Sequence, residues 1–214
     1  MRGPLETRLA AAVLFLAAAA AWTQQATVAF NWAFVKRAAG GAPAALDFKE
    51  KVNIGPGDLF KIHVQPLENA FVYVYLDDAQ GELQCLFPSD FSVFEGASYL
   101  DQKFFIPGGD NWFALDSARG TERFYLVASS VRLSRLESFT TALGKSTGSS
   151  KGTARQAVLD EIARIRKEHS QLTMAAEKPV TVAGSSRGLA AAIQKAATRI
   201  EAPGFYYKLF RLEH

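Results

Sequence analysis

The strongest constraint on the fold is a series of short segments in which apolar residues recur at every second position, separated by turn-forming residues. Residues 60–65 alternate Phe, Ile and Val with Lys, His and Gln, which is typical of a strand with one dry and one wet face, so His63 is expected to point to water. Phe71–Leu76 is apolar on both faces and predicts a central strand covered on both sides. Asp77–Gly81 supplies turn formers before a further strand, Glu82–Phe87, and the two strands are predicted to form a hairpin.

Further strands are predicted on either side of this hairpin. They cover Thr27–Lys36, Leu46–Val52, Lys103–Ile106, Trp112–Leu115 and Arg123–Ser129. The closing segment Gly204–Leu212 is rich in large apolar and aromatic residues, so we expect a last strand that returns to the sheet. Short strands between turns, with no long helix among them, favour a mainly β fold: an antiparallel β-sandwich or a partly open barrel.

The pattern changes after the last of these internal strands. Residues 144–152 are polar and rich in Gly and Ser, which predicts a flexible joint. Beyond the joint, apolar residues at helical spacing predict an amphipathic helix over about 153–172, with His169 on its apolar stripe. A second helix is predicted over about 187–201, ended by Pro203 and Gly204. We therefore expect a two- to three-helix appendage.

The predicted organisation has three parts. Residues 1–21 form a signal peptide, residues 27–133 and 204–214 form the β-sandwich domain, and residues 134–203 form the helical appendage.

The N-terminus has the features of a secretory signal peptide. Two arginines within the first eight residues precede the unbroken apolar run Leu9–Ala21, which reaches about 20 Å as a helix and falls short of the roughly 30 Å hydrocarbon core. Ala19 and Ala21 supply small residues for cleavage before Trp22. The alternative is an Ala-rich helix packed on the domain. A periplasmic or secreted protein without a stable membrane span is expected, because no cysteine lies near the end of the run where a lipid anchor would need one.

Composition excludes some classes of protein and leaves others open. The chain of 214 residues is 49% apolar and 21% charged, which is ordinary for a folded globular protein. The net charge of +3 is too small to indicate a nucleic-acid partner. Cys85 is the only cysteine, so no intramolecular disulfide forms, and its alternation with Leu83 and Phe87 on one presumed inward face predicts a small core side chain rather than a reactive nucleophile.

Several short motifs occur in a recognisable order. They are Gly57-Asp58-Leu59-Phe60-Lys61-Ile62, Ala70-Phe71-Val72-Tyr73-Val74-Tyr75, the turn Gln80-Gly81, Leu86-Phe87-Pro88, Phe105-Ile106-Pro107, Gly120-Thr121-Glu122 and Val127-Ala128-Ser129. In this order and spacing, roughly residues 47–133 resemble the bacterial domain of unknown function 4384 (DUF4384). The resemblance implies a β-rich module of exported or envelope-associated bacterial proteins, sometimes attached to kinase or protease domains, with no established catalytic residues to carry over.

The residues that could hold a metal or a nucleotide do not form a known motif. His63, His169 and His214 are the only histidines, and no two of them have a zinc-ligand spacing. The acidic turn around Asp77, Asp78 and Glu82 lacks the alternating carboxylates of a calcium loop, so an ordinary hydrated turn is preferred over a Ca²⁺ site. Residues 144–147 have the tail of a P-loop, but the required first glycine is replaced by Phe139. We expect no metal and no cofactor.

Two sets of side chains remain as candidates for chemistry or binding. Asp110, Asp116 and Glu122 could act as an acid/base pair if their loops converge, which would make the protein an envelope hydrolase. Loop aromatics offer the other set, since Trp112, Tyr99 and Phe91, with Asp110 beside them, could form a patch for a partner or a sugar chain.

The basic residues of the first predicted helix offer a further surface. They are Lys151, Arg155, Arg164, Arg166 and Lys167, and they could face an anionic envelope polymer or lipid, although interspersed acidic residues favour a solvated face. No catalytic constellation is complete. The preferred function is therefore an exported, non-catalytic interaction or assembly module of the bacterial cell envelope, whose partner is an envelope protein or a cell-wall polymer. The alternative is an envelope hydrolase or a peptidoglycan- or polysaccharide-binding protein.

Overall fold

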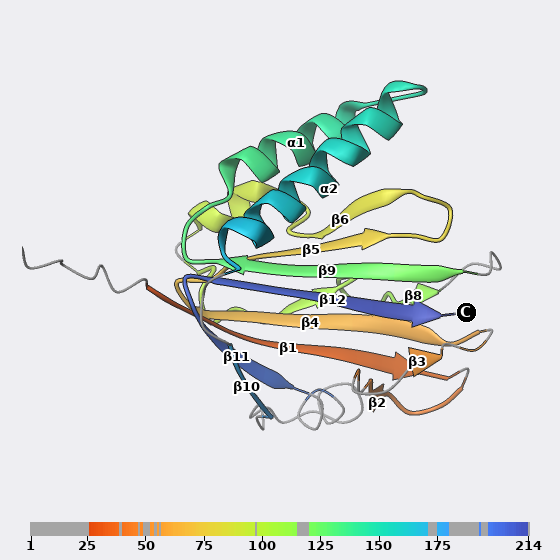
Figure 1. The fold of residues 1–214 in the computed structure, drawn as a ribbon. Coiled ribbons are helices and arrows are strands. Elements are labelled where there is room, and N and C mark those ends of the chain that lie inside the picture. Colours follow the sequence, from red (N-terminus) through yellow and green to blue (C-terminus); the bar gives the residue numbers. More distant parts are fainter. Residues whose placement is uncertain are drawn as a thin grey trace, which may run out of the picture.

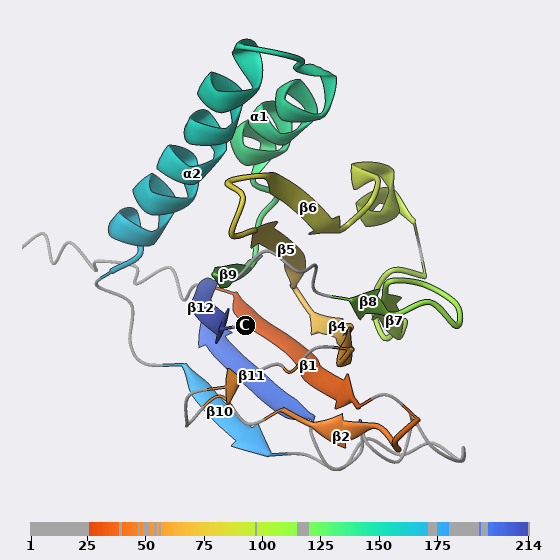
Figure 2. The same ribbon diagram turned by 90° about the vertical axis from the view of Figure 1, so that its right-hand side faces the viewer.

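Within the residues that it describes, the computed structural model contains two β-sheets packed face to face, with two helices on the outer side of one sheet (Figures 1 and 2). It describes residues 26–213 apart from 39, 47, 49–51, 54, 56, 97, 115–119, 171–174, 180–192 and 194–196. The predicted signal peptide and its cleavage before Trp22 lie outside the described residues.

The first sheet has the strand order β10-β11-β1-β4-β7, with β2 paired to β1 and β8 paired to β4. Its strands are β1 (Thr27–Arg37), β2 (Ala44–Ala45), β4 (Leu59–Glu68), β7 (Phe104–Ile106), β8 (Phe113–Ala114), β10 (Ala176–Pro179) and β11 (Thr198–Pro203). All pairings in this sheet are antiparallel, and β1 and β4 form its centre.

The second sheet has the strand order β3-β12-β9-β5-β6. Its strands are β3 (Val52–Asn53), β5 (Phe71–Asp77), β6 (Leu83–Phe87), β9 (Thr121–Ser129) and β12 (Phe205–Glu213). Among the described strand pairs of this sheet, the short contact of β3 with β12 is the parallel one. The predicted hairpin is confirmed as β5 and β6, with Gly81 at φ +83° in its turn, and the predicted last strand is confirmed as β12.

The main core lies between the two sheets and is made of alternate side chains from both. Phe34 of β1 meets Phe124 of β9 edge to face, with ring centroids 5.0 Å apart, and Trp32 lies 4.6 Å from Phe210 of β12. This period-of-two burial is what the alternating segments predicted. The mainly β fold, an antiparallel sandwich rather than a closed barrel, is confirmed.

A second apolar layer lies on the other side of the second sheet. Here α1 (Ser134–Lys145) and α2 (Ser150–Glu168) form a helical hairpin across β5, β9 and β12 (Figure 2). The stripe predicted in the amphipathic helix is buried against the sheet through Val158, Ile162 and Ile165. Neither helix has the length and apolar character that a membrane span requires. Because both faces of β5 are covered, its two-sided apolar sequence is explained.

Buried hydroxyl groups fix the position of α1 on this sheet. The Tyr73 hydroxyl donates to Glu137 Oε1 at 2.7 Å and accepts the backbone N–H of Leu133 at 3.1 Å. Arg132 holds the same carboxylate through its Nε at 3.1 Å. The Tyr75 hydroxyl lies 2.8 Å from Thr140 Oγ1. Burial raises the pKa of both tyrosines, so these groups stay neutral hydrogen-bonding anchors.

The expectation that His63 points to water is wrong. Its side chain is 1% exposed, because the outer face of β4 is covered by a small cluster that includes Phe105, Trp112 and Ile193. The His63 ring lies 5.2 Å from the ring of Phe105, and Nδ1 lies 3.2 Å from the carbonyl oxygen of Phe104. Lys61, on the same face, is also buried and donates to the carbonyl of Gly109 at 2.6 Å. Local alternation cannot reveal a cover that is built from distant segments.

The predicted helix over 187–201 is wrong at its C-terminal end, where β11 begins at Thr198. Ile200 of β11 pairs with Phe30 of β1, and its side chain is fully buried in the main core. Residues 176–179, which the sequence assigned to the helical appendage, form the neighbouring strand β10. Pairing with the long strand β1 therefore prevails over the helical periodicity. Residues 187–192 and 194–196 lie outside the described residues.

Candidate functional site

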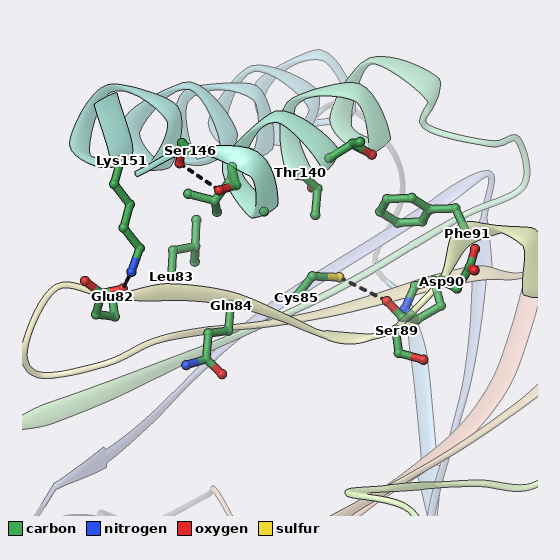
Figure 3. A pocket seen from close by; sticks show the side chains of 14 residues that line it. Glu82, Leu83, Gln84, Cys85, Ser89, Asp90, Phe91, Thr140, Ser146 and Lys151 are labelled. Carbon is green, nitrogen blue, oxygen red and sulfur yellow. Dashed lines mark hydrogen bonds and ion pairs between the residues drawn. The ribbon is translucent and has the colours of Figure 1, made fainter. Parts of the chain in front are cut away.

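A groove of about 670 Å³ lies between β6, the 3₁₀ helix η1 (Phe91–Glu95) and α1, within the size range of ligand-binding clefts (Figure 3). It is lined by Glu82, Leu83, Gln84, Cys85, Pro88, Ser89, Asp90, Phe91, Thr140, Thr141, Leu143, Gly144, Ser146 and Lys151. One wall is a strand at the edge of the second sheet, and the other is the C-terminal half of α1.

A β-bulge determines which side chains of β6 face this groove. Tyr75 pairs with Cys85 and Val74 with Phe87, so the register shifts between the two pairs. Leu83 and Cys85 point toward the helices, whereas Phe87 is buried in the main core between the sheets. The prediction that all three share one inward face is therefore wrong for Phe87, because a bulge reverses the alternation at the point where it occurs.

Cys85 is partly buried and forms the floor of the groove (Figure 3). Its Sγ lies 3.4 Å from the carbonyl oxygen of Phe87 and 3.5 Å from that of Pro88. Burial raises the pKa of the thiol to about 12, so very little thiolate is present near neutral pH. This environment agrees with the structural role predicted for Cys85.

The hairpin end of the groove is closed by ion pairs to α2. Glu82 pairs with Lys151 across the opening. Asp77, which is 2% exposed, accepts hydrogen bonds from Arg155 at 2.6 and 3.0 Å and faces Arg123 at 3.5 Å. The acidic turn that the sequence offered as a weak Ca²⁺ candidate is thus engaged by basic side chains. Within the described residues, no group of three or more His, Cys, Asp or Glu is arranged to hold a metal ion.

The opposite end of the groove is formed by Asp90 and Phe91. The carboxylate of Asp90 accepts the backbone N–H of Ser92 at 2.8 Å and caps η1, and this hydrogen bond lowers the pKa of Asp90. Phe91 is partly buried against Phe94 and Tyr73 and turns its ring toward the groove (Figure 3). Of the aromatic residues predicted for binding, Phe91 is the one that lines this groove.

The other predicted binding residues lie elsewhere and do not gather around Phe91. Trp112 stands on the first sheet between two cations, with the guanidinium of Arg37 4.4 Å and Lys61 Nζ 5.3 Å from its ring centroid. Asp110 is exposed in the loop before Trp112.

Tyr99 is not a loop aromatic open to solvent, so the expectation of an exposed ring is wrong. The side chain is 5% exposed because the chain after η1 turns back into the core, where Tyr99 lies 5.1 Å from Phe94 and its hydroxyl accepts the N–H of Val72 at 3.1 Å. Burial raises the pKa of this hydroxyl above its usual range.

The carboxylates considered for acid/base work have separate surroundings. Glu122 is buried in β9 and accepts the backbone N–H of Ala79 at 3.3 Å. Asp110 is exposed in the loop between β7 and β8, and Asp116 lies outside the described residues. The exposed Asp110 of this loop and the buried Glu122 of β9 therefore have different surroundings.

Most of the basic residues predicted to form one helix face have partners within the molecule. The contacts are Lys151 with Glu82, Arg155 with Asp77, Arg164 with Glu161 at 2.7 Å, and Arg166 over the ring of Tyr207 at 5.2 Å. These contacts leave fewer positive charges for an anionic ligand.

The α1 wall of the groove was not predicted from the sequence. Thr140, Thr141, Gly144 and Ser146 carry no motif, and they reach β6 only because α1 is anchored on the second sheet. The one local signal is the small and hydroxylated stretch at 144–147, which by itself suggests only the tail of a P-loop.

Part of the chain matches a known protein family. Residues 54–132 match the family model described as Domain of unknown function (DUF4384). No curated protein and no solved structure matches the chain. The matched segment runs through β4 to β9 and supplies β6 and η1, whereas α1 lies beyond it. The chain thus contains a DUF4384-like domain at residues 54–132, and the groove lies between that domain and the helix that follows it.

Proposed function

We propose that this protein is an exported, non-catalytic interaction module of the bacterial cell envelope, and that it binds its partner in the groove between β6 and α1. The observation that carries the proposal is that the groove combines an open sheet edge with charged side chains that have partners within the molecule, Lys151 for Glu82 and the N–H of Ser92 for Asp90. Recognition needs such an accessible, shaped surface, whereas catalysis needs a group poised to transfer a proton or to attack.

The chemistry of the groove supports binding over reaction. The thiol of Cys85 is held protonated, the carboxylate of Asp90 caps η1, and Glu82 is paired with Lys151. Hydroxyl groups of α1 and the apolar side chains of Leu83 and Leu143 make up much of the remaining lining. This mixture of apolar surface and neutral hydrogen-bonding groups is typical of sites that hold a ligand in one orientation.

The envelope location rests on the N-terminal sequence. A basic start, the apolar run Leu9–Ala21 and small residues before Trp22 are the basis for export to the periplasm or beyond. N-terminal sequencing of protein recovered from the periplasm tests this part of the proposal. A mature chain that begins at or within a few residues of Trp22 supports export, and a cytoplasmic chain that retains Met1 contradicts it.

Affinity capture with a blocked groove tests the binding role. Gly144 lines the groove from α1, and a Cβ added to it would meet no neighbouring atom within 4 Å, so Gly144→Trp places a ring in the groove without backbone strain. Ala142→Trp is the matched control, since Ala142 is exposed on the same helix outside the lining. We expect the mature protein and the control to retain the same envelope component and Gly144→Trp to lose it. Equal retention by all three proteins contradicts binding in the groove.

A further inference from the structure

The strand β6 forms an edge of the second sheet and pairs only with β5 among the described strands. At the hairpin turn, the N–H of Asp78 donates to the carbonyl oxygen of Glu82 at 2.9 Å. Hydrogen-bonded and non-hydrogen-bonded pairs alternate in an antiparallel ladder, so the pair of Leu76 with Gln84 is a hydrogen-bonded one. The backbone N–H and C=O groups of Leu83 and Cys85 consequently point away from β5, along the open edge.

This edge differs from the other sheet edges of the described chain. Edge strands are usually protected from pairing with other chains because they are short, charged, or interrupted by a proline or a β-bulge. The strands β2, β3 and β8 have two residues each and β7 has three, and β10 contains two charged residues and a proline. In contrast, β6 has five residues, Leu-Gln-Cys-Leu-Phe, with neither a charge nor a proline, and its bulge lies beyond Cys85, toward Phe87.

We infer that the groove binds an extended peptide segment of a partner protein, which pairs with the open edge of β6 as an additional strand of the second sheet. This inference rests on the proposed function and names its ligand class. A row of outward main-chain donors and acceptors is complementary to another extended main chain, and strand addition to an exposed edge is a recurring mode of peptide recognition. The regular part of β6 before its bulge, Leu83 to Cys85, provides about 10 Å of pairing length.

The two walls of the groove determine which side chains such a peptide can have. Successive side chains of an added strand point to opposite faces of the sheet. One set of alternate side chains meets the α1 wall, where Thr140, Leu143 and Ser146 offer an apolar and hydroxylated surface. The other set lies on the side of Gln84, which is exposed and points away from the helices (Figure 3). A peptide with β-branched or small residues at alternate positions fits this arrangement.

The charges at the two ends of the groove indicate the direction in which the peptide chain runs. Lys151 is matched by Glu82 at the hairpin end, whereas Asp90 is an exposed carboxylate at the other end, with a backbone N–H of Ser92 as its partner. A basic residue at the Asp90 end therefore complements the groove. For a strand antiparallel to β6, that end receives the N-terminal part of the peptide.

The probe is a displayed library of short random peptides, selected against the mature protein and counter-selected against Gly144→Trp. We expect selected peptides with alternating β-branched residues and a basic residue near the N-terminus, and we expect Asp90→Asn to weaken their binding. Hydrogen exchange followed by NMR gives the decisive readout. On peptide binding, the amide protons of Leu83 and Cys85 should become protected, whereas that of Gln84 is already paired with β5 and should change little.

N-methylation of the selected peptide tests main-chain pairing without altering the protein. Methylation at every second residue should abolish binding, and methylation at the residues between them should leave it nearly unchanged. Uniform tolerance of N-methylation, or binding without protection of Leu83 and Cys85, overturns strand addition. Sedimentation shows whether the chain forms a dimer that Gly144→Trp prevents. Such a dimer overturns binding of a different protein and assigns the edge of β6 to a second copy of this chain.

The two proposals fail in different ways. If no library peptide binds while an envelope component is still captured in a Gly144-dependent manner, the peptide class is wrong and the groove remains a binding site. If neither is retained, the proposed function itself is wrong.

Discussion

Acidification from about pH 7 to about pH 5 is expected to destabilise the fold through His63. Its ring is buried on the first sheet, with Nδ1 donating to the carbonyl of Phe104, and Nε2 has no hydrogen-bond partner among the described residues. Protonation would place a charge on a nitrogen that faces no acceptor within the described part of the chain. Burial, assisted by the nearby charge of Lys103, therefore lowers the pKa of His63 to about 4.

The size of the effect follows from the two pKa values. The unfolded chain binds the proton with the ordinary pKa of 6.5, and the folded chain binds it only near 4. Because the folded pKa is the lower one, stability is complete above about pH 6.5 and falls as the pH drops through the window between the two values. At pH 5 the linkage relation gives a loss of about 2 kcal/mol from the free energy of unfolding, and near pH 4 about 3 kcal/mol.

Urea unfolding at several pH values, followed by tryptophan fluorescence, measures this loss in the wild type and in His63→Asn. The asparagine amide supplies a donor near the position of Nδ1 and does not titrate, so the variant is less stable at neutral pH but should show a flatter pH dependence. The difference between the two slopes isolates His63 from the other titrating groups, which both proteins share. If the free energy of unfolding has the same slope with pH in both proteins between about pH 7 and pH 5, burial of a neutral His63 is refuted as the cause of the acid destabilisation.

Three further outcomes are expected. Tyr73→Phe should lower the free energy of unfolding by about 1 to 3 kcal/mol, because it leaves the N–H of Leu133 without its acceptor, whereas Tyr75→Phe should lower it by only about 1 kcal/mol. Urea titration of both variants measures the two losses. An equal loss contradicts the anchoring role of Tyr73. Alkylation of Cys85 by iodoacetamide near pH 8 should be roughly 30-fold slower in the folded than in the unfolded chain, because the raised pKa of the folded thiol leaves less of the reactive thiolate. Mass spectrometry measures both rates, and equal rates contradict the raised pKa. Gly144→Ala should raise the melting temperature, with a gain of about 0.5 kcal/mol from helix propensity in open space, whereas a lower melting temperature contradicts that environment.

The predictable part of the fold is the part encoded by short-range patterns. Two-sided apolar sequence and adjacent turn residues predict β5 and its hairpin with β6, and the large apolar and aromatic residues of the closing segment predict β12. The stripe of α2 likewise predicts its buried face, because side chains three and four apart share one side of a helix.

The unpredicted part depends on segments that meet only in the folded chain. His63 is buried because Phe105 and Trp112 return over β4 from about forty residues away in the sequence. Ile200 belongs to a strand because β1 offers it a partner, although its own neighbourhood has helical spacing. Tyr99 is drawn inward by a hydrogen bond to the backbone of Val72. None of these partners lies within the short window over which periodicity can be read.

The candidate site was harder to predict than the fold for the same reason. One wall comes from residues 82–91 and the other mainly from residues 140–151. No motif connects the two segments, and the family match ends at residue 132, before α1 begins. The sequence alone therefore favours aromatic loop residues such as Trp112, whereas the groove lies between an open strand edge and a helix that carries hydroxyl groups.

Photo-crosslinking in living cells tests the central claim most directly. Benzoylphenylalanine in place of Gly144 puts the reactive ketone in the groove, and the same group in place of Ala142 puts it on the exposed side of α1. The account predicts a discrete crosslinked partner from position 144 that is absent from position 142. Crosslinks of equal yield from both positions, or none from position 144 while the protein is folded and exported, contradict a binding role for this groove.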